Sequence, residues 1–89
     1  MQQARKRLAD TLYADESETL SALRLAAGFS QAQLAEKALT SQPHIARIER
    51  GQTDPGTDLI ARIAAALGID DMRVYRAIRN QLATRGDPA

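Results

Sequence analysis

Apolar residues recur along this chain at intervals of three and four, the spacing that places side chains on one face of an α-helix. Five such series are separated by glycines, by capping residues or by the Asp-Pro-Gly turn at residues 54–56. The pattern therefore predicts an all-α fold of five helices. The inward positions, in chain order, are Leu20, Leu23 and Ala27; Leu34, Ala35 and Ala38; Ile45 and Ile48; Leu59, Ile60, Ile63, Ala64 and Leu67; and Val74, Tyr75, Ile78 and Leu82.

Capping residues mark the start of the first of two central helices. Ser30 and Gln33 have the spacing of a capping box, in which each side chain bonds the backbone N–H of the other residue. Phe29 and Leu34 flank this box at the spacing of a hydrophobic staple. A helix is therefore predicted to begin at Gln31.

The second central helix follows a turn at Leu39 and Thr40. Ser41 is its predicted N-cap, and Pro43 is tolerated in a first turn because the missing N–H would make no helical bond there. Gly51 is expected to end the helix in a left-handed conformation. The residues predicted to face away from the core are Gln42, Pro43, Ala46, Arg47 and Arg50.

The remaining boundaries are predicted in the same way. Asp15 with Glu18 repeats the capping-box spacing, so a helix is expected from Glu16 to Ala27. A fourth helix is expected from Thr57 to Leu67, ending at Gly68. A fifth would run from a cap at Asp70 or Asp71 to about Thr84, with its apolar stripe opposite Arg73, Arg76 and Arg79.

These boundaries define one domain over residues 15–84, preceded by an extension over 1–14 and followed by a tail over 85–89. The extension contains the basic triplet Arg5, Lys6 and Arg7, which is interpreted either as solvated surface or as an arm on DNA phosphate or in a minor groove. Leu8 and Leu12 suit a short helix.

Composition makes the predicted core thin. The 89 residues are 44% apolar but include only three aromatic residues, so leucine, isoleucine and alanine must supply the packing. Dimerisation would bury a further apolar surface. The stripe Val74, Tyr75, Ile78 and Leu82 is the candidate dimer face; the alternative is that it completes the core of the monomer.

The inventory of reactive side chains argues against catalysis. There is no cysteine, and the single histidine, His44, lies in the first turn of a predicted helix, so no catalytic residues, metal ligands or cofactor are expected. No apolar run approaches the roughly 18 residues of a membrane span, which indicates a soluble cytoplasmic protein without a membrane partner. A net charge of +1 requires a nucleic-acid binder to separate its charges in space.

Residues from about Leu20 to Asp70 resemble, without a gap, the helix-turn-helix domain of Xre-type regulators, the group related to the Cro and CI repressors of phages. The resemblance implies a compact five-helix, lambda-repressor-like DNA-binding domain. The markers are Leu23, Arg24, Gly28, Ser30, Gln31, Leu34, Ala35, Ser41, Ile45, the string Ile48-Glu49-Arg50-Gly51, Pro55, and the ending Ala66-Leu67-Gly68. The chain departs from the family at Leu39, where glycine is usual; a leucine at positive φ would carry strain of about 1 kcal/mol or more unless the turn is built differently.

The resemblance also implies roles for individual residues. Gln42, Pro43 and Arg47 match positions that contact DNA bases, and Gln31 matches a position that anchors phosphate. Arg24 and Glu49 match a partly buried salt bridge. Further candidates for phosphate contact are Lys37, His44 and Arg50, each of which has a solvated surface residue as its alternative.

The predicted function is a transcriptional repressor that binds a palindromic operator in double-stranded DNA as a homodimer. One alternative is an antitoxin that neutralises a toxin protein through the segments 5–13 and 72–82 and represses its own operon; restriction-system controllers form another small group of this kind. A helical scaffold without nucleic acid is the third interpretation, and it predicts no salt-dependent affinity for DNA.

Overall fold

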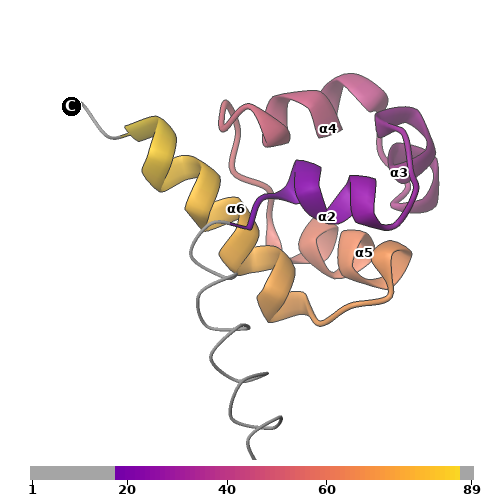
Figure 1. Ribbon diagram of the computed structural model, residues 1–89. Coiled ribbons are helices and arrows are strands. Elements are labelled where there is room, and N and C mark those ends of the chain that lie inside the picture. The colour runs from indigo at the N-terminus through magenta and orange to yellow at the C-terminus, as the bar shows by residue number, and fades with distance from the viewer. Residues whose placement is uncertain (1–17, 87–89) are drawn as a thin grey trace, which may run out of the picture.

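The computed structural model describes residues 18–86, which form five α-helices and no strand (Figure 1). The predicted all-α fold is therefore confirmed over this range. The predictions for the basic triplet at residues 5–7, for Leu8 and Leu12 and for a cap at Asp15 lie outside it. The helices are α2 (Leu20–Ala26), α3 (Gln31–Lys37), α4 (Gln42–Glu49), α5 (Thr57–Leu67) and α6 (Asp71–Gly86).

Helix α2 begins later than predicted. Glu18 and Thr19 are not helical, and Thr19 is the N-cap, with its hydroxyl accepting the Ala22 N–H at 3.1 Å. The Glu18 carboxylate instead accepts two hydrogen bonds from Arg73, at 3.0 and 2.8 Å. The capping-box interpretation of Glu18 was wrong because this side chain ties α2 to α6 across the fold.

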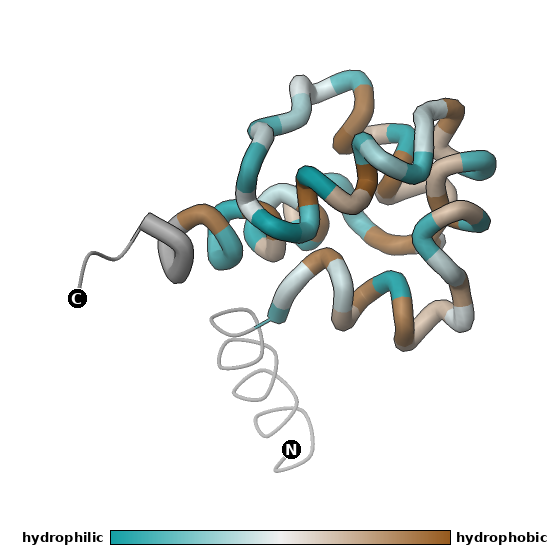
Figure 2. Tube along the Cα trace, turned by 90° about the horizontal axis from the view of Figure 1, so that it is seen from above, coloured by the Kyte–Doolittle hydropathy of each residue, from teal (hydrophilic) through white to brown (hydrophobic). Residues whose placement is uncertain are grey.

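Each helix contributes at least one fully buried side chain to a single core. Figure 2 shows apolar and polar stretches alternating along each helix, as this arrangement requires. Burying a leucine or isoleucine completely stabilises a fold by about 1.5–3 kcal/mol, so these contacts are the main source of stability. The largest buried residues are Leu20, Leu34, Ile45, Ile48, Ile63, Val74 and Ile78.

Helix α6 completes the protomer core, so the stripe predicted as a dimer face is wrong in its main members. Val74 and Ile78 are 0% and 1% exposed, and Leu82 packs against the same core. Only Tyr75 of this stripe is exposed. The physical reason is that α2, α3 and α4 are only seven or eight residues long. The remaining core surface is covered by α6, which packs against α5, α2 and α4.

The turn between α3 and α4 has the ordinary geometry of a helix end, with an unusual residue in it. Leu39 has φ of +59° and donates its N–H to the Glu36 carbonyl, while Thr40 donates to the Ala35 carbonyl at 2.9 Å. This pair of bonds is the Schellman arrangement, in which glycine is the common residue at positive φ. The turn is not built differently around the leucine, so the strain expected from the sequence applies.

Candidate nucleic-acid interface

Helices α3 and α4 are held by the caps that the sequence predicts. The Ser30–Gln33 capping box is complete, with bonds of 3.0 and 2.8 Å, and Ser41 accepts the His44 N–H at 3.3 Å. Pro43 lies in the first turn of α4, where its missing N–H has no helical acceptor. Figure 1 shows α4 along the upper edge of the molecule, with α3 beside it.

The outward face of α4 carries Gln42, Pro43, Arg47 and Arg50, all of which are exposed as predicted. Ala46 is the exception, because it is only 4% exposed and belongs to the inward face. Neither the Arg47 nor the Arg50 guanidinium makes a hydrogen bond or ion pair with any other residue in the range 18–86. Two guanidinium groups are therefore available on this face.

A chain of side-chain hydrogen bonds connects the start of α4 to the interior. Gln42 Nε2 donates to Gln31 Oε1 at 2.8 Å, and Gln31 Nε2 donates to Glu49 Oε1 at 2.9 Å. Glu49 also forms the salt bridge with Arg24 that the family resemblance implies, with Arg24 Nε 2.6 Å from Glu49 Oε2. The base-contact candidate Gln42 and the phosphate-anchor candidate Gln31 are thus directly bonded, which the spacing alone did not indicate.

The Arg24–Glu49 pair is almost fully enclosed. The side chains are 10% and 7% exposed, and Arg24 Nη1 donates a further bond to the Phe29 carbonyl at 2.9 Å. These contacts join the end of α2, the loop before α3 and the last turn of α4. Removing one partner of a buried ion pair costs about 3–5 kcal/mol, because the remaining charge is left unpaired. The pair therefore fixes where α4 sits.

The other phosphate candidates lie around α4, with different constraints. Lys37, in the last turn of α3, places its ammonium 5.3 Å from the centre of the Phe29 ring, within range of a cation–π contact. The ring of His44 is hydrogen bonded through Nδ1 to the Thr40 hydroxyl at 3.0 Å. Arg50 is the C-cap of α4. Lys37 and Arg50 are exposed cations, whereas His44 is half-buried.

Two side chains that position this surface were not predicted from the sequence. Gln81, buried in α6, accepts the Leu20 N–H at 2.6 Å and donates to the Ile48 carbonyl at 2.8 Å. Arg62 of α5 donates to the Ala38 carbonyl at the end of α3. A signal for Gln81 existed, since it lies seven residues after Val74 and so shares its inward face.

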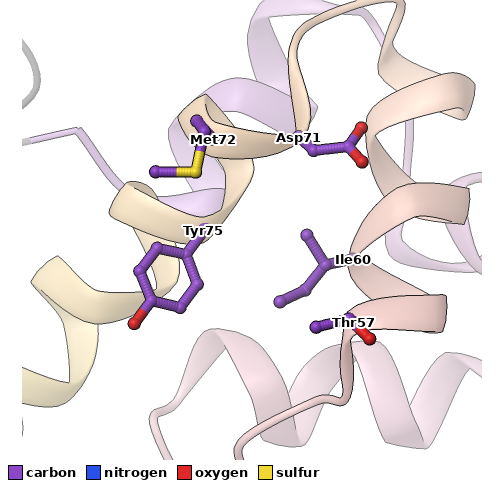
Figure 3. A pocket seen from close by; sticks show the side chains of 5 residues that line it. All are labelled: Thr57, Ile60, Asp71, Met72 and Tyr75. Carbon is purple, nitrogen blue, oxygen red and sulfur yellow. The ribbon is translucent and has the colours of Figure 1, made fainter.

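A separate apolar hollow lies between α5 and α6. It has a volume of about 270 Å³ and is lined by Thr57, Ile60, Asp71, Met72 and Tyr75. Figure 3 shows Ile60 of α5 pointing toward Tyr75 of α6 across this hollow. Met72 and Tyr75 are about half exposed. The hollow involves neither α3 nor α4.

The described residues contain no group of three or more histidine, cysteine or acidic side chains placed to hold a metal ion. Within the same range, no helix combines the length and apolar character needed to cross a bilayer.

Comparison with known proteins gives one family. The family model described as helix-turn-helix matches residues 20–71, more than half of the chain. The match begins with the first residue of α2 and ends with the first residue of α6. No curated protein matches the chain.

Proposed function

Because the chain belongs to the Xre/Cro/CI-like helix-turn-helix family of DNA-binding transcription regulators, we propose that it recognises one operator sequence and represses transcription there. The observation that carries this proposal is that Gln42, in the first turn of α4, and Arg47, in its last turn, are both exposed. An α-helix fits the major groove of B-form DNA, and its leading residues meet the base edges.

The proposed readout divides between three side chains. The carboxamide of Gln42 matches the donor and acceptor of adenine, and the guanidinium of Arg47 matches the two acceptors of guanine. Pro43 has no donor, and its ring offers apolar contact to a thymine methyl group. Specificity would therefore rest mainly on Gln42 and Arg47.

Phosphate contacts would hold the helix in this position. Lys37 and Arg50 supply exposed positive charge, and Gln31 and His44 supply further hydrogen-bond donors. The only acidic residue in α4 is Glu49, and its charge is paired with Arg24 inside the protein. The face offered to DNA would therefore be positive locally, although the net charge of the chain is only +1.

We further propose a homodimer on a palindromic operator. Two copies of α4 would enter successive major grooves, about 34–36 Å apart, and the bound dimer would exclude polymerase. No catalytic step is proposed, and no metal or cofactor is needed for this mechanism.

The test begins with selection of bound fragments from random DNA at a stated salt concentration. Arg47→Ala is then compared with wild type on the selected site and on its single-base variants. We expect the variant to lose about 1–3 kcal/mol of binding free energy, with relaxed preference at one base pair in each half-site. Arg79→Ala is the matched control, because Arg79 is an exposed arginine on α6. An unchanged operator preference in Arg47→Ala would remove this residue from the readout.

An antitoxin remains the second proposed function, and the hollow between α5 and α6 favours it. Half-exposed Met72 and Tyr75 offer apolar surface to a protein partner while α4 stays available to DNA. If the neighbouring reading frame encodes a toxin, co-expression of this chain should restore growth. Tyr75→Arg should abolish that rescue and leave DNA binding intact. If the product of the neighbouring reading frame does not slow growth, this chain is not its antitoxin.

A further inference from the structure

The hollow between α5 and α6 takes no part in the proposed DNA contact, and its walls are largely apolar. Ile60 of α5 is only 6% exposed, whereas Met72 and Tyr75 of α6 are 50% and 44% exposed. Figure 3 shows these three side chains arranged around an open centre. One aliphatic side chain, one thioether and one aromatic ring therefore supply the apolar surface of the hollow.

Two polar groups also line the hollow. One is the Asp71 carboxylate, in the first turn of α6, and the other is the Thr57 hydroxyl, in the first turn of α5. Neither group makes a hydrogen bond or ion pair with another residue of the range 18–86. Figure 3 shows Asp71 above Ile60 and Thr57 below it. A molecule that fills the apolar centre would thus find a free carboxylate and a free hydroxyl at its ends.

The charge of the lining restricts what such a molecule can be. Asp71 is the one charged side chain among the five lining residues, so an anion would be repelled. A purely apolar molecule would cover part of the carboxylate without offering it a donor. A metal ion needs more ligands than one carboxylate, and the described residues contain no group of three acidic, histidine or cysteine side chains placed to hold one. An organic ammonium ion supplies the opposite charge and three donors.

The size of the hollow and its apolar groups favour the same class of ligand. An aromatic ring attracts a cation that lies within about 6 Å of its centre, and Tyr75 supplies such a ring. The flexible, polarizable Met72 side chain can adapt to an alkyl or aryl group. The volume of about 270 Å³ lies just below the range of about 300–1,000 Å³ that is usual for ligand pockets. A small molecule therefore fits better than a large one.

We propose that this hollow binds a small amphipathic amine, namely a primary alkyl- or arylammonium ion. Its charged group contacts Asp71, and its apolar body lies between Ile60, Met72 and Tyr75. The site is independent of the proposed DNA recognition, because neither α3 nor α4 lines it. A toxin seated on Met72 and Tyr75 would compete with the amine for the same surface.

The first test compares n-hexylammonium, 1-hexanol and hexanoate, which share one alkyl chain and differ in charge. Each is titrated into the full chain at neutral pH and low salt, and NMR follows the methyl signals of Ile60 and Met72. Hexylammonium should shift both signals to saturation with a Kd of about 1–10 mM, as expected for so small a ligand. The Ile45 methyl signals, in α4, should not move.

The order of affinities reports the charge of the site. An exposed ion pair adds a modest increment, so hexylammonium should bind about three- to fivefold more tightly than hexanol. Hexanoate should bind more weakly than either, because Asp71 repels it. Equal affinities of the three probes, or the absence of saturable shifts at Ile60 and Met72, would overturn the proposal.

The second test removes the charge of Asp71 while keeping the size of its side chain. Asp71→Asn should bind hexylammonium no more tightly than hexanol, and its affinity for hexanol should stay within about twofold of wild type. Asp58→Asn is the matched control, because Asp58 is an exposed acid in the first turn of α5 that does not line the hollow. Tyr75→Ala should weaken hexylammonium and hexanol alike, since it removes apolar surface. A preference for hexylammonium that survives in Asp71→Asn would contradict the proposal.

Dilution of the free protein tests the competing occupant. If the Ile60 and Met72 methyl signals shift on dilution without any probe, a second copy of the chain covers the hollow, and the amine site is wrong. Signals that stay in place on dilution are expected for an open hollow. None of these outcomes depends on whether the protein binds DNA, so the failure of one proposal does not decide the other.

Discussion

At the scale of single residues, Leu39 has a backbone conformation that is unfavourable for its residue type. Its φ of +59° lies in the left-handed region, and the residue is 77% exposed, so packing recovers little of the strain. The neighbouring helix end at Gly51 has the same pair of hydrogen bonds, with a glycine at φ of +72°. The turn thus tolerates leucine without being adapted to it.

Leu39→Gly should therefore stabilise the protein. Relief of about 1–2 kcal/mol of left-handed strain exceeds the added entropy of glycine in the unfolded chain, which costs about 0.4–1 kcal/mol. We expect a net gain of roughly 1 kcal/mol in the free energy of unfolding, measured by urea denaturation.

Leu25→Gly is the matched control, because Leu25 is a leucine inside helix α2 that is also largely exposed, at 64%. It should lose about 1 kcal/mol through helix propensity alone. If both variants lose stability to the same extent, the turn does not strain Leu39.

Alanines limit what apolar spacing can predict for single residues. Ala27 was expected inward and is exposed, whereas Ala46 was expected outward and is buried. A methyl group contributes little free energy to burial, roughly 0.8 kcal/mol per carbon, so either side of a helix tolerates it. The leucines and isoleucines, whose burial is worth more, were assigned correctly.

At the scale of elements, helix limits follow from short-range chemistry. Caps at Ser30 and Ser41 and the ends of α4 and α5 at Gly51 and Gly68 lie where the sequence places them. Each depends on contacts within a few residues, which a sequence contains directly. The start of α2 was misjudged because the partner of Glu18 is Arg73, far away in the chain.

Helix α6 is tied to α4 through one buried amide. Gln81 satisfies the Leu20 N–H at the start of α2 and the Ile48 carbonyl near the end of α4. The Leu20 N–H belongs to the first turn of α2 and has no intrahelical acceptor, whereas the Ile48 carbonyl also accepts the Gly51 N–H at 3.0 Å. Gln81 therefore joins three helices and supplies the hydrogen-bond partner of the Leu20 N–H.

Gln81→Met should destabilise the fold by about 1–3 kcal/mol, because the buried Leu20 N–H loses its partner, while the Ile48 carbonyl keeps the Gly51 N–H. Urea denaturation measures this change. Gln52→Met replaces an exposed glutamine and should stay within about 0.5 kcal/mol of wild type. A Gln81→Met variant as stable as wild type would mean that water replaces the amide.

At the scale of the whole molecule, positive charge is concentrated around α4 although the net charge of the chain is only +1. The chain has 12 basic and 11 acidic residues, yet exposed Lys37, Arg47 and Arg50 lie on or beside α4, and Glu49 is neutralised internally. Net charge is thus a poor guide to nucleic-acid binding for this chain.

The dependence of DNA affinity on salt concentration should report these positive charges. With Lys37 and Arg50 on phosphates in each copy of a dimer, four cations release counterions, and log K should fall with log salt at a slope of about −4. Lys37→Gln should reduce this slope by about 2, because it removes one charged contact per copy. A slope near zero for wild type would contradict phosphate anchoring by these residues.

The sequence by itself determined the helical class, the limits of α3, α4 and α5, the inward leucines and isoleucines, and the exposure of Gln42 and Arg47. These features depend on periodicity and capping, which act over a few residues. Only the tertiary structure decided that α6 closes the protomer core, that Gln81 joins three helices, and that Gln42 is bonded through Gln31 to the Arg24–Glu49 pair. These contacts join side chains from different helices, and their geometry exists only once the helices have packed.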